Sequence, residues 1–223
     1  GAGQAINDFF DLEIDKQSTK KRILTQKLIE PKTAFYYSIA LFAIGILISL
    51  FIGPTQFLIA LIFSLLLFFY SWKLKNFKFL GNIVIAASTA FTIIFGASIT
   101  GNYQLPIILA FGAFFANLSR ELIKDIEDLN IDKDFKKTLP LMIPLNGVKT
   151  LALLFALAAV IVVFIPYYFA MLSNIFYLIF LILAVLAIIY AFKELFSNNY
   201  RKSHNYMKYA MLLVLVAFLG ALI

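Results

Sequence analysis

Seven long runs of apolar residues constrain the fold of this chain more than any other feature of its sequence. Each run is about 20 residues long, which is the length that an α-helix needs to cross a hydrocarbon core of roughly 30 Å. The runs are continuously apolar rather than alternating, which favours membrane helices over barrel strands. We therefore predict an all-α integral membrane protein. The predicted spans cover residues 33–52, 55–72, 79–101, 104–120, 146–165, 174–192 and 206–223.

The composition agrees with a chain that is solvated by lipid. Hydrophobic residues make up 62% of the 223 residues and charged residues only 14%, far from the balance of a water-soluble domain. Cysteine is absent, which excludes disulfides and thiolate metal sites. A net charge of +7 would indicate nucleic-acid binding only if the basic residues formed one surface exposed to water. Here the basic residues instead separate the apolar runs. We expect no nucleic-acid partner, and a single domain over residues 1–223 because no linker or repeat is visible.

The charged residues are distributed on one side of the predicted bundle. When the spans are threaded up and down, every Lys, Arg, Asp and Glu falls on the same side of the membrane. Lys and Arg mark the cytoplasmic ends of membrane helices, so this side is predicted to be cytoplasmic. We expect a multi-pass protein of the cell membrane with its polar site on the cytoplasmic face. His204, the one histidine, lies in a basic turn there and is expected at the surface.

Two acidic motifs lie on this predicted cytoplasmic side. The first is "NDFFDLEIDK", residues 7–16, and the second is "RELIKDIEDLNIDKD", residues 120–134. At helical spacing each motif would align its oxygen-bearing side chains on one helix face, with Phe9 and Phe10 of the first motif pointing away. The aligned residues are Asn7, Asp8, Asp11 and Asp15 in the first motif and Asp125, Asp128 and Asp132 in the second. Like charges this close repel, so we expect a cation to neutralise them.

The chemistry of these side chains indicates a magnesium diphosphate site. Carboxylate and amide oxygens without imidazole or thiolate suit a hard ion such as Mg²⁺, which completes its shell with waters and phosphate oxygens. Two such clusters would clamp a diphosphate between bound metal ions. Nearby cations can bind the remaining phosphate oxygens; they are Arg22, Lys73, Lys75, Arg120 and Lys124. An anionic head above an apolar bundle predicts a prenyl diphosphate substrate. The competing interpretation is a solvated, salt-bridged cap on the helix ends.

The two motifs resemble those of the UbiA family of membrane prenyltransferases. "NDFFDLEID" is similar to the family's NDxxDxxxD motif, and "DIEDLNID" to its second, DxxxD-type motif. The segments at residues 70–82 ("YSWKLKNFKFLGN") and 120–140 resemble the archaeal digeranylgeranylglyceryl phosphate synthases of that family. One departure is that Asn130 and Ile131, rather than Gly, precede Asp132. The resemblance implies a bundle of nine transmembrane helices. About seven of them, plus the end of helix 2, would be in this chain, with helix 1 and most of helix 2 absent.

The resemblance also implies an activity. It is the Mg²⁺-dependent transfer of a geranylgeranyl group from its diphosphate to geranylgeranylglyceryl phosphate, which forms the second ether bond of archaeal membrane lipid. Asp11, Asp128 and Tyr70 would be catalytic, and Tyr70 would hydrogen-bond a bridging or leaving oxygen. The metal ligands would be Asn7, Asp8, Asp11, Asp15, Asp125, Asp128 and Asp132. Lys73, Arg120 and Lys124 would neutralise the diphosphate.

Two other functions stay open at this point. One is a UbiA-type enzyme with an aromatic acceptor such as a quinone precursor. A phosphorylated acceptor would need a second basic site, for which the candidates are Arg201, Lys202 and Lys208. The other is a divalent-cation transporter, which is disfavoured because no acidic or basic residue lies in the middle of any predicted span.

Overall fold

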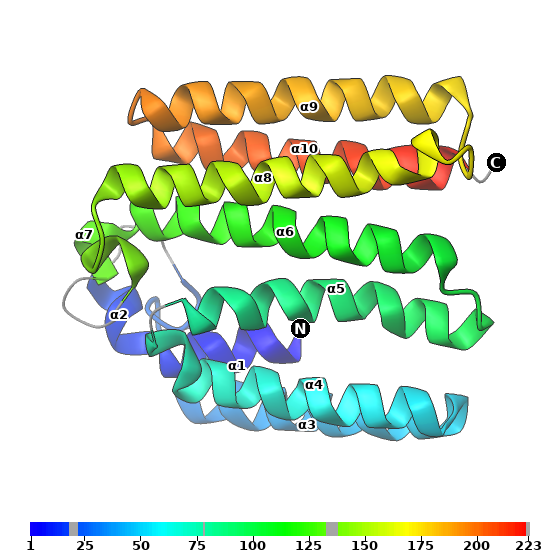
Figure 1. Ribbon diagram of the computed structural model, residues 1–223. Helices are drawn as coiled ribbons and strands as arrows, with labels where there is room; N and C mark the ends of the chain where they lie inside the picture. Colours follow the sequence, from blue (N-terminus) through cyan, green and yellow to red (C-terminus); the bar gives the residue numbers. More distant parts are fainter. Residues whose placement is uncertain (18–21, 78, 133–137, 222–223) are drawn as a thin grey trace.

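The computed structural model describes residues 1–17, 22–77, 79–132 and 138–221, and every regular element within these ranges is a helix. Long helices run side by side, and shorter ones gather at one end (Figure 1). The all-α prediction is confirmed. The long helices are α3 (Pro31–Ile52), α4 (Pro54–Trp72), α5 (Leu80–Thr100), α6 (Gln104–Glu127), α8 (Leu145–Tyr168), α9 (Ile175–Phe196) and α10 (Tyr200–Gly220).

Six of the seven predicted spans are helices that are long and apolar enough to cross a membrane, namely α3, α4, α5, α6, α8 and α9. The seventh prediction corresponds to α10, which is helical but less apolar. Its first turns carry Arg201, Lys202, His204 and Lys208, and only its second half is continuously apolar. Several helices also extend past their predicted ends, as α6 does to Glu127, because a helix can continue beyond the hydrocarbon into the polar interface. The chain is a multi-pass membrane protein.

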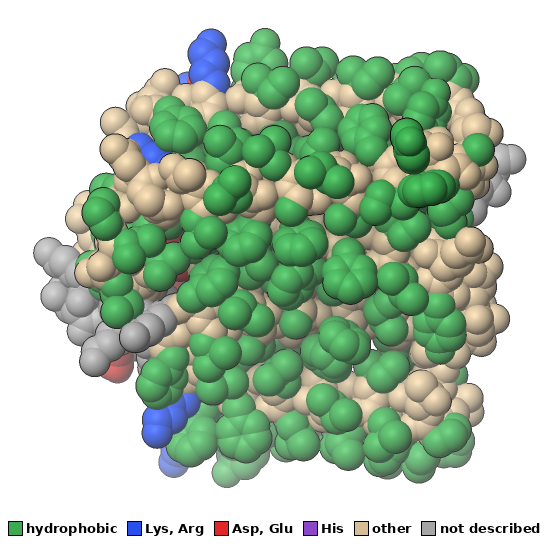
Figure 2. All heavy atoms as spheres, in the orientation of Figure 1, with side chains coloured by type: hydrophobic (Ala, Val, Ile, Leu, Met, Phe, Trp, Pro, Cys, Tyr) green, Lys and Arg blue, Asp and Glu red, His purple; other side chains and the backbone are tan. Residues whose placement is uncertain are grey.

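The two ends of the bundle differ in charge. The connections at one end contain no Lys, Arg, Asp or Glu; they are Gly53 and residues 101–103 and 169–174. Gly101 ends α5 with a φ of 71°, a left-handed conformation that glycine adopts without strain. On the face drawn in Figure 2, hydrophobic side chains cover the long helices, and the charged ones appear at the left end. The alternating helix directions therefore bring all described charges to one end, as the sequence predicts.

Two packed groups of helices make up the bundle. α8 and α10 pack against α6, and α9 packs against α8 and α10. The core of this group near the charged end includes Leu122, Val148 and Leu195. On the other side, α1 (Ala2–Phe10) packs against α3 and α4. Its Phe9 ring lies 5.1 Å from that of Phe35, and its Phe10 ring lies 6.0 Å from that of Phe68, measured between centroids. These aromatic contacts fix the helix that carries the first acidic motif and leave its acidic side chains on other faces.

Candidate active site

The two acidic motifs lie at the charged end, on elements that touch each other. The first motif spans α1 and α2 (Leu12–Gln17), and the second spans the end of α6 and α7 (Leu129–Asp132). α2 contacts α7, and Figure 1 shows both short helices at the same end of the bundle. The fold therefore brings together two segments that are far apart in the sequence.

Each motif is interrupted at its central acid, so it does not form the single continuous helix that the spacing predicts. α1 ends at Phe10 and α6 at Glu127, so the central acid of each motif follows a helix end. Asp11 has φ −90° and ψ 3°, and Asp128 has φ −91° and ψ 5°. This sparsely populated backbone conformation interrupts the helix at one residue. The N–H groups of Asp11 and Asp128 still donate to the carbonyls four residues earlier. As a result, the last acid of each motif is carried by a separate short helix.

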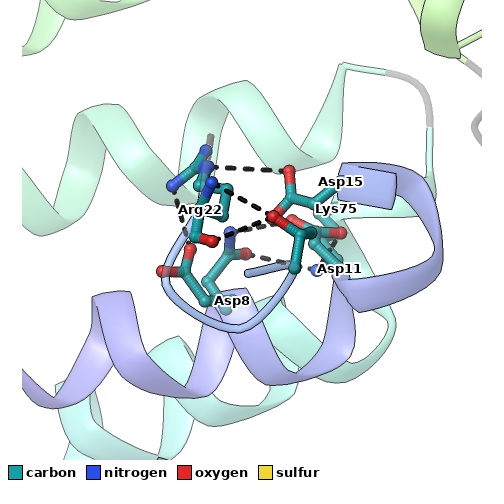
Figure 3. Close-up of polar contacts among 7 residues, drawn as sticks. Asp8, Asp11, Asp15, Arg22 and Lys75 are labelled. Carbon is teal, nitrogen blue, oxygen red and sulfur yellow. Dashed lines mark hydrogen bonds and ion pairs between the residues drawn. The ribbon is translucent and has the colours of Figure 1, made fainter. Parts of the chain in front are cut away.

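Arg22 and Lys75 hold the acidic residues of the first motif (Figure 3). Arg22 Nη1 lies 3.0 Å from Asp8 Oδ1, and its Nε lies 3.6 Å from Asp15 Oδ1. Lys75 Nζ lies 2.7 Å from Asp11 Oδ1 and donates to Asn7 Oδ1 at 3.2 Å. Asn7 Nδ2 in turn donates to Asp11 Oδ2 at 2.8 Å. Cations from within the chain thus relieve the repulsion that the sequence predicts.

Lys75 and Lys73 have different environments, although the sequence gives no reason to separate them. The Lys75 side chain is only 6% exposed and lies in a 3₁₀ turn, η1 (Leu74–Asn76). Lys73 is exposed at the C-terminal end of α4. Tyr70 lies one turn earlier on α4, and its ring edge packs near Gly81 at the start of α5. The structure therefore places Lys75, rather than Lys73, in the first motif.

A residue outside both motifs, which sequence reasoning missed, contacts the second motif. Asn82 Nδ2 donates to Asp125 Oδ2 at 2.8 Å, and Asn82 is buried in the first turn of α5. Its signal in the sequence is only an amide just inside an apolar span. Asp128 caps α6, and Asp132 ends α7, but the side chain of Asp132 lies outside the described part of the chain.

Two predicted phosphate ligands on α6 are paired with a neighbouring acid. Arg120 Nη1 lies 2.7 Å from Glu121 Oε1, and Lys124 Nζ lies 3.6 Å from Glu121 Oε2. Glu121 is buried and pairs with both cations, of which Lys124 stays 42% exposed. Arg201 and Lys202 are exposed on the first turn of α10.

The expectation that His204 is a surface residue is wrong. Its side chain is 12% exposed, and its Nδ1 lies 3.0 Å from Glu127 Oε2. Burial, followed by the nearby charges of Arg120, Lys208 and Lys124, lowers the pKa of His204 to about 4, against the opposing effect of Glu121. The ring is therefore neutral near pH 7, and its Nδ1–H donates to Glu127. This bond ties α10 to the α6 end that carries the second motif.

The donor set suits a hard cation, although the acids are now bonded within the chain. Among the described residues, no three His, Asp or Glu side chains stand close enough together to hold a metal ion. Oxygen is the ligand atom of every predicted metal-binding side chain, as Mg²⁺ prefers. Asp11 Oδ1 is buried and faces Lys75 as an ion pair, without a well-directed hydrogen bond. These side chains fit Mg²⁺ when the phosphate groups of a bound substrate share Arg22 and Lys75 with the carboxylates.

An apolar cavity of about 620 Å³ lies among α5, α6, α8, α9 and α10. Its polar lining is a stripe on α5, where the hydroxyls of Ser88, Thr89 and Thr92 donate to carbonyls of their own helix. These hydroxyls therefore need no partner in the cavity. The lining residues Ile85, Ala116 and Met207 lie one helical turn below Asn82, Arg120 and His204, respectively. The cavity thus begins directly beneath the polar end and has the size of a small-molecule site.

Comparison with known proteins explains this arrangement. The sequence profile of the UbiA prenyltransferase family matches residues 1–219. The chain is 38% identical to the digeranylgeranylglyceryl phosphate synthase of Thermococcus kodakarensis, over 98% of this chain and 80% of that protein. This chain belongs to the UbiA prenyltransferase family. The resemblance drawn from the two acidic motifs is confirmed.

Solved structures show the same UbiA fold. One, from work on digeranylgeranylglyceryl phosphate synthase in membranes, is 31% identical with a TM-score of 0.79, over 99% of this chain and 80% of that one. A UbiA homologue from Archaeoglobus fulgidus, bound to GPP and Mg²⁺, is 20% identical with a TM-score of 0.70, over 96% of this chain and 82% of that one. The predicted UbiA-type bundle is confirmed, and this chain forms part of it.

Proposed function

We propose that this chain transfers a geranylgeranyl group from geranylgeranyl diphosphate to the free hydroxyl of geranylgeranylglyceryl phosphate. The observation that carries the proposal is the meeting of two acidic motifs above an apolar cavity. The similarity to digeranylgeranylglyceryl phosphate synthases over nearly the whole chain supports the choice of acceptor. We place the reaction at the cytoplasmic face of the cell membrane because Lys and Arg mark that face. Residues 1–223 would act as one catalytic domain.

The diphosphate would bind between the two motifs. Mg²⁺, held by Asn7, Asp8, Asp11, Asp15, Asp125, Asp128 and Asp132, would stabilise the negative charge on the departing diphosphate. Arg22 and Lys75 already face these acids and would bind the remaining phosphate oxygens when the substrate enters. Arg120 and Lys124 lie at the same end and would add positive charge, to which the exposed Lys73 would contribute only weakly. Tyr70 would hydrogen-bond the leaving oxygen.

The chain's own residues would support a substitution at C1 of the prenyl group, in which the acceptor hydroxyl replaces the diphosphate. The bond from C1 to the diphosphate oxygen breaks, the acceptor hydroxyl oxygen bonds to C1, and the hydroxyl proton leaves with the diphosphate. The apolar cavity would hold the prenyl chain and exclude water, which otherwise competes with the acceptor. For the acceptor's phosphate, Arg201, Lys202 and Lys208 are the proposed basic partners, because all three are exposed at the charged end.

The proposal is tested by giving the purified chain, in lipid nanodiscs, labelled geranylgeranyl diphosphate and one of two acceptors. Label should appear in the ether lipid when geranylgeranylglyceryl phosphate is supplied. Label transferred only to an aromatic quinone precursor would instead identify the aromatic-acceptor alternative. Absence of transfer, together with divalent-cation flux into vesicles containing the chain, would identify a transporter.

Removal of divalent cations should stop the reaction. Because the proposed ligands are carboxylate and amide oxygens, an excess of EDTA is expected to reduce transfer to background, and added Mg²⁺ should restore it. The measurement is product formation at fixed donor concentration across a Mg²⁺ titration. Full turnover in excess EDTA would contradict the assignment of both motifs as metal sites.

A substitution that narrows the cavity should weaken the binding of long prenyl donors more than that of short ones. Ala113 lines the cavity from α6, and Ala113→Leu adds three carbons to that wall. Crowding of this size in an apolar pocket is expected to raise KM for geranylgeranyl diphosphate about tenfold. The shorter geranyl diphosphate should be affected less than twofold. Ala158→Leu, on α8 but outside the cavity lining, is the matched control. Equal changes for both donors would show that the tail does not reach Ala113.

A further inference from the structure

One short connection touches both acidic motifs. Between α4 and α5, Lys75 bonds to Asn7 and Asp11 of the first motif. Seven positions later, Asn82 bonds to Asp125 of the second motif. Both residues are largely buried, with Asn82 only 7% exposed, so these bonds form where water competes weakly. The connection is therefore a physical link between the motifs.

Gly81 fixes the distance between the two contacts. A Cβ atom at this position would lie 3.1 Å from the Cα of Lys75 and 3.5 Å from Cε2 of Tyr70. The start of α5 is thus packed directly against the backbone of the turn that carries Lys75. Since backbone cannot move aside as a flexible side chain can, a larger residue at position 81 would displace Lys75 relative to Asn82.

The amide of Asn82 differs from the other partners of the acids. Arg22 and Lys75 compensate the charge of the carboxylates that they contact. Asn82 is neutral, so it can orient Asp125 without cancelling its charge. Hydrogen bonds that orient ligating side chains in this way are common around protein metal sites.

We propose that Asn82 is a positioning residue for the second motif. It orients Asp125 for the metal-bound diphosphate, and through Gly81 it sets this motif relative to Lys75 and the first motif. The inference rests on the proposed function. It adds a residue from α5 to a site otherwise built from the two acidic motifs and the cations beside them.

The alternative is that Asn82 is merely a buried hydrogen-bonding residue that stabilises the fold. Asn117 offers a matched control because it is also a buried asparagine, 4% exposed, within a long helix. Its Nδ2 donates at 2.9 Å to the carbonyl of Ala113 in its own helix. Asn117→Ala therefore removes an equivalent amide without touching an acid.

The test compares Asn82→Ala with Asn117→Ala in the full chain, using two measurements. The first is the rise in thermal unfolding temperature that Mg²⁺ and inorganic pyrophosphate cause, which does not depend on turnover. The second is the Mg²⁺ concentration that gives half-maximal transfer. Asn82→Ala should lose most of the ligand-induced rise and need about tenfold more Mg²⁺. Asn117→Ala should keep both wild-type values even if the unliganded protein melts earlier.

A charge swap separates positioning from folding if Asn82→Ala does not fold. Combining Asn82→Asp with Asp125→Asn restores an amide–carboxylate pair but moves the charge from α6 to α5. We expect this double variant to fold and still lack the Mg²⁺ and pyrophosphate response. A normal response in the swap, or in Asn82→Ala, would overturn the positioning role. If the wild-type chain shows no response to Mg²⁺ and pyrophosphate, the proposed function itself fails, and the two failures are thereby distinguished.

Discussion

Lys75→Ala is expected to lower prenyl transfer at least about 100-fold, whereas Lys73→Ala should change it by less than about threefold. Both lysines lie in the connection after α4, but only Lys75 is buried and contacts Asn7 and Asp11. Replacing Lys75 with alanine takes away a phosphate partner and leaves the buried Asp11 Oδ1 without its cation. Loss of one partner from a buried ion pair also costs about 3 kcal/mol of stability. Lys73 is exposed, so water replaces its contacts easily.

The measurement is kcat and KM for geranylgeranyl diphosphate, taken below the unfolding temperature of each variant. Lys75→Arg keeps the charge but presents a planar fork where a single ammonium group fits, so only part of the activity should return. If Lys75→Ala retains normal turnover while its unfolding temperature falls, then Lys75 serves the fold alone. A larger loss in Lys73→Ala than in Lys75→Ala would reverse our assignment of the two residues.

The helices could be predicted from the sequence because lipid imposes a local rule. Every backbone group in hydrocarbon must be bonded within its own helix, so the length of an apolar run predicts a span without knowledge of its neighbours. The same rule predicts that the charges of this chain collect at one end. The rule is less informative for α10, because the first half of this helix contains Arg201 and Lys208 and lies outside the apolar run.

The membership of the site could be predicted in part, but its geometry could not. The spacing of acids in the two motifs identifies which residues belong together, since it depends on local helical periodicity. The turns at Asp11 and Asp128 have no Gly or Pro beside them to indicate that a helix ends there. The contacts of Asn82 and the burial of His204 come from packing between helices that are distant in the sequence. No local pattern encodes such contacts.

The most decisive result is expected from Asp11→Asn, Asp128→Asn and their combination. Each single replacement should reduce transfer by about 1,000-fold or more, because each central acid would serve the same metal-bound diphosphate. The double variant should be little worse than either single one, since residues that act as one unit are not additive. Asp11→Asn should also lower stability by about 2 kcal/mol, as it weakens the contact with Lys75.

Glu13→Gln provides the matched control within the first motif. Glu13 lies on α2 between Asp11 and Asp15, but its side chain is 74% exposed and pairs with Lys16. The same loss of a carboxylate charge should therefore leave transfer unchanged. If the losses in Asp11→Asn and Asp128→Asn multiply in the double variant, the motifs act at two separate sites. If both single variants transfer like the wild type, the acids are solvated caps on helix ends and the proposed catalytic role is wrong. A common, non-additive loss is the result expected if one ligand touches both motifs, which the contact between α2 and α7 makes geometrically possible.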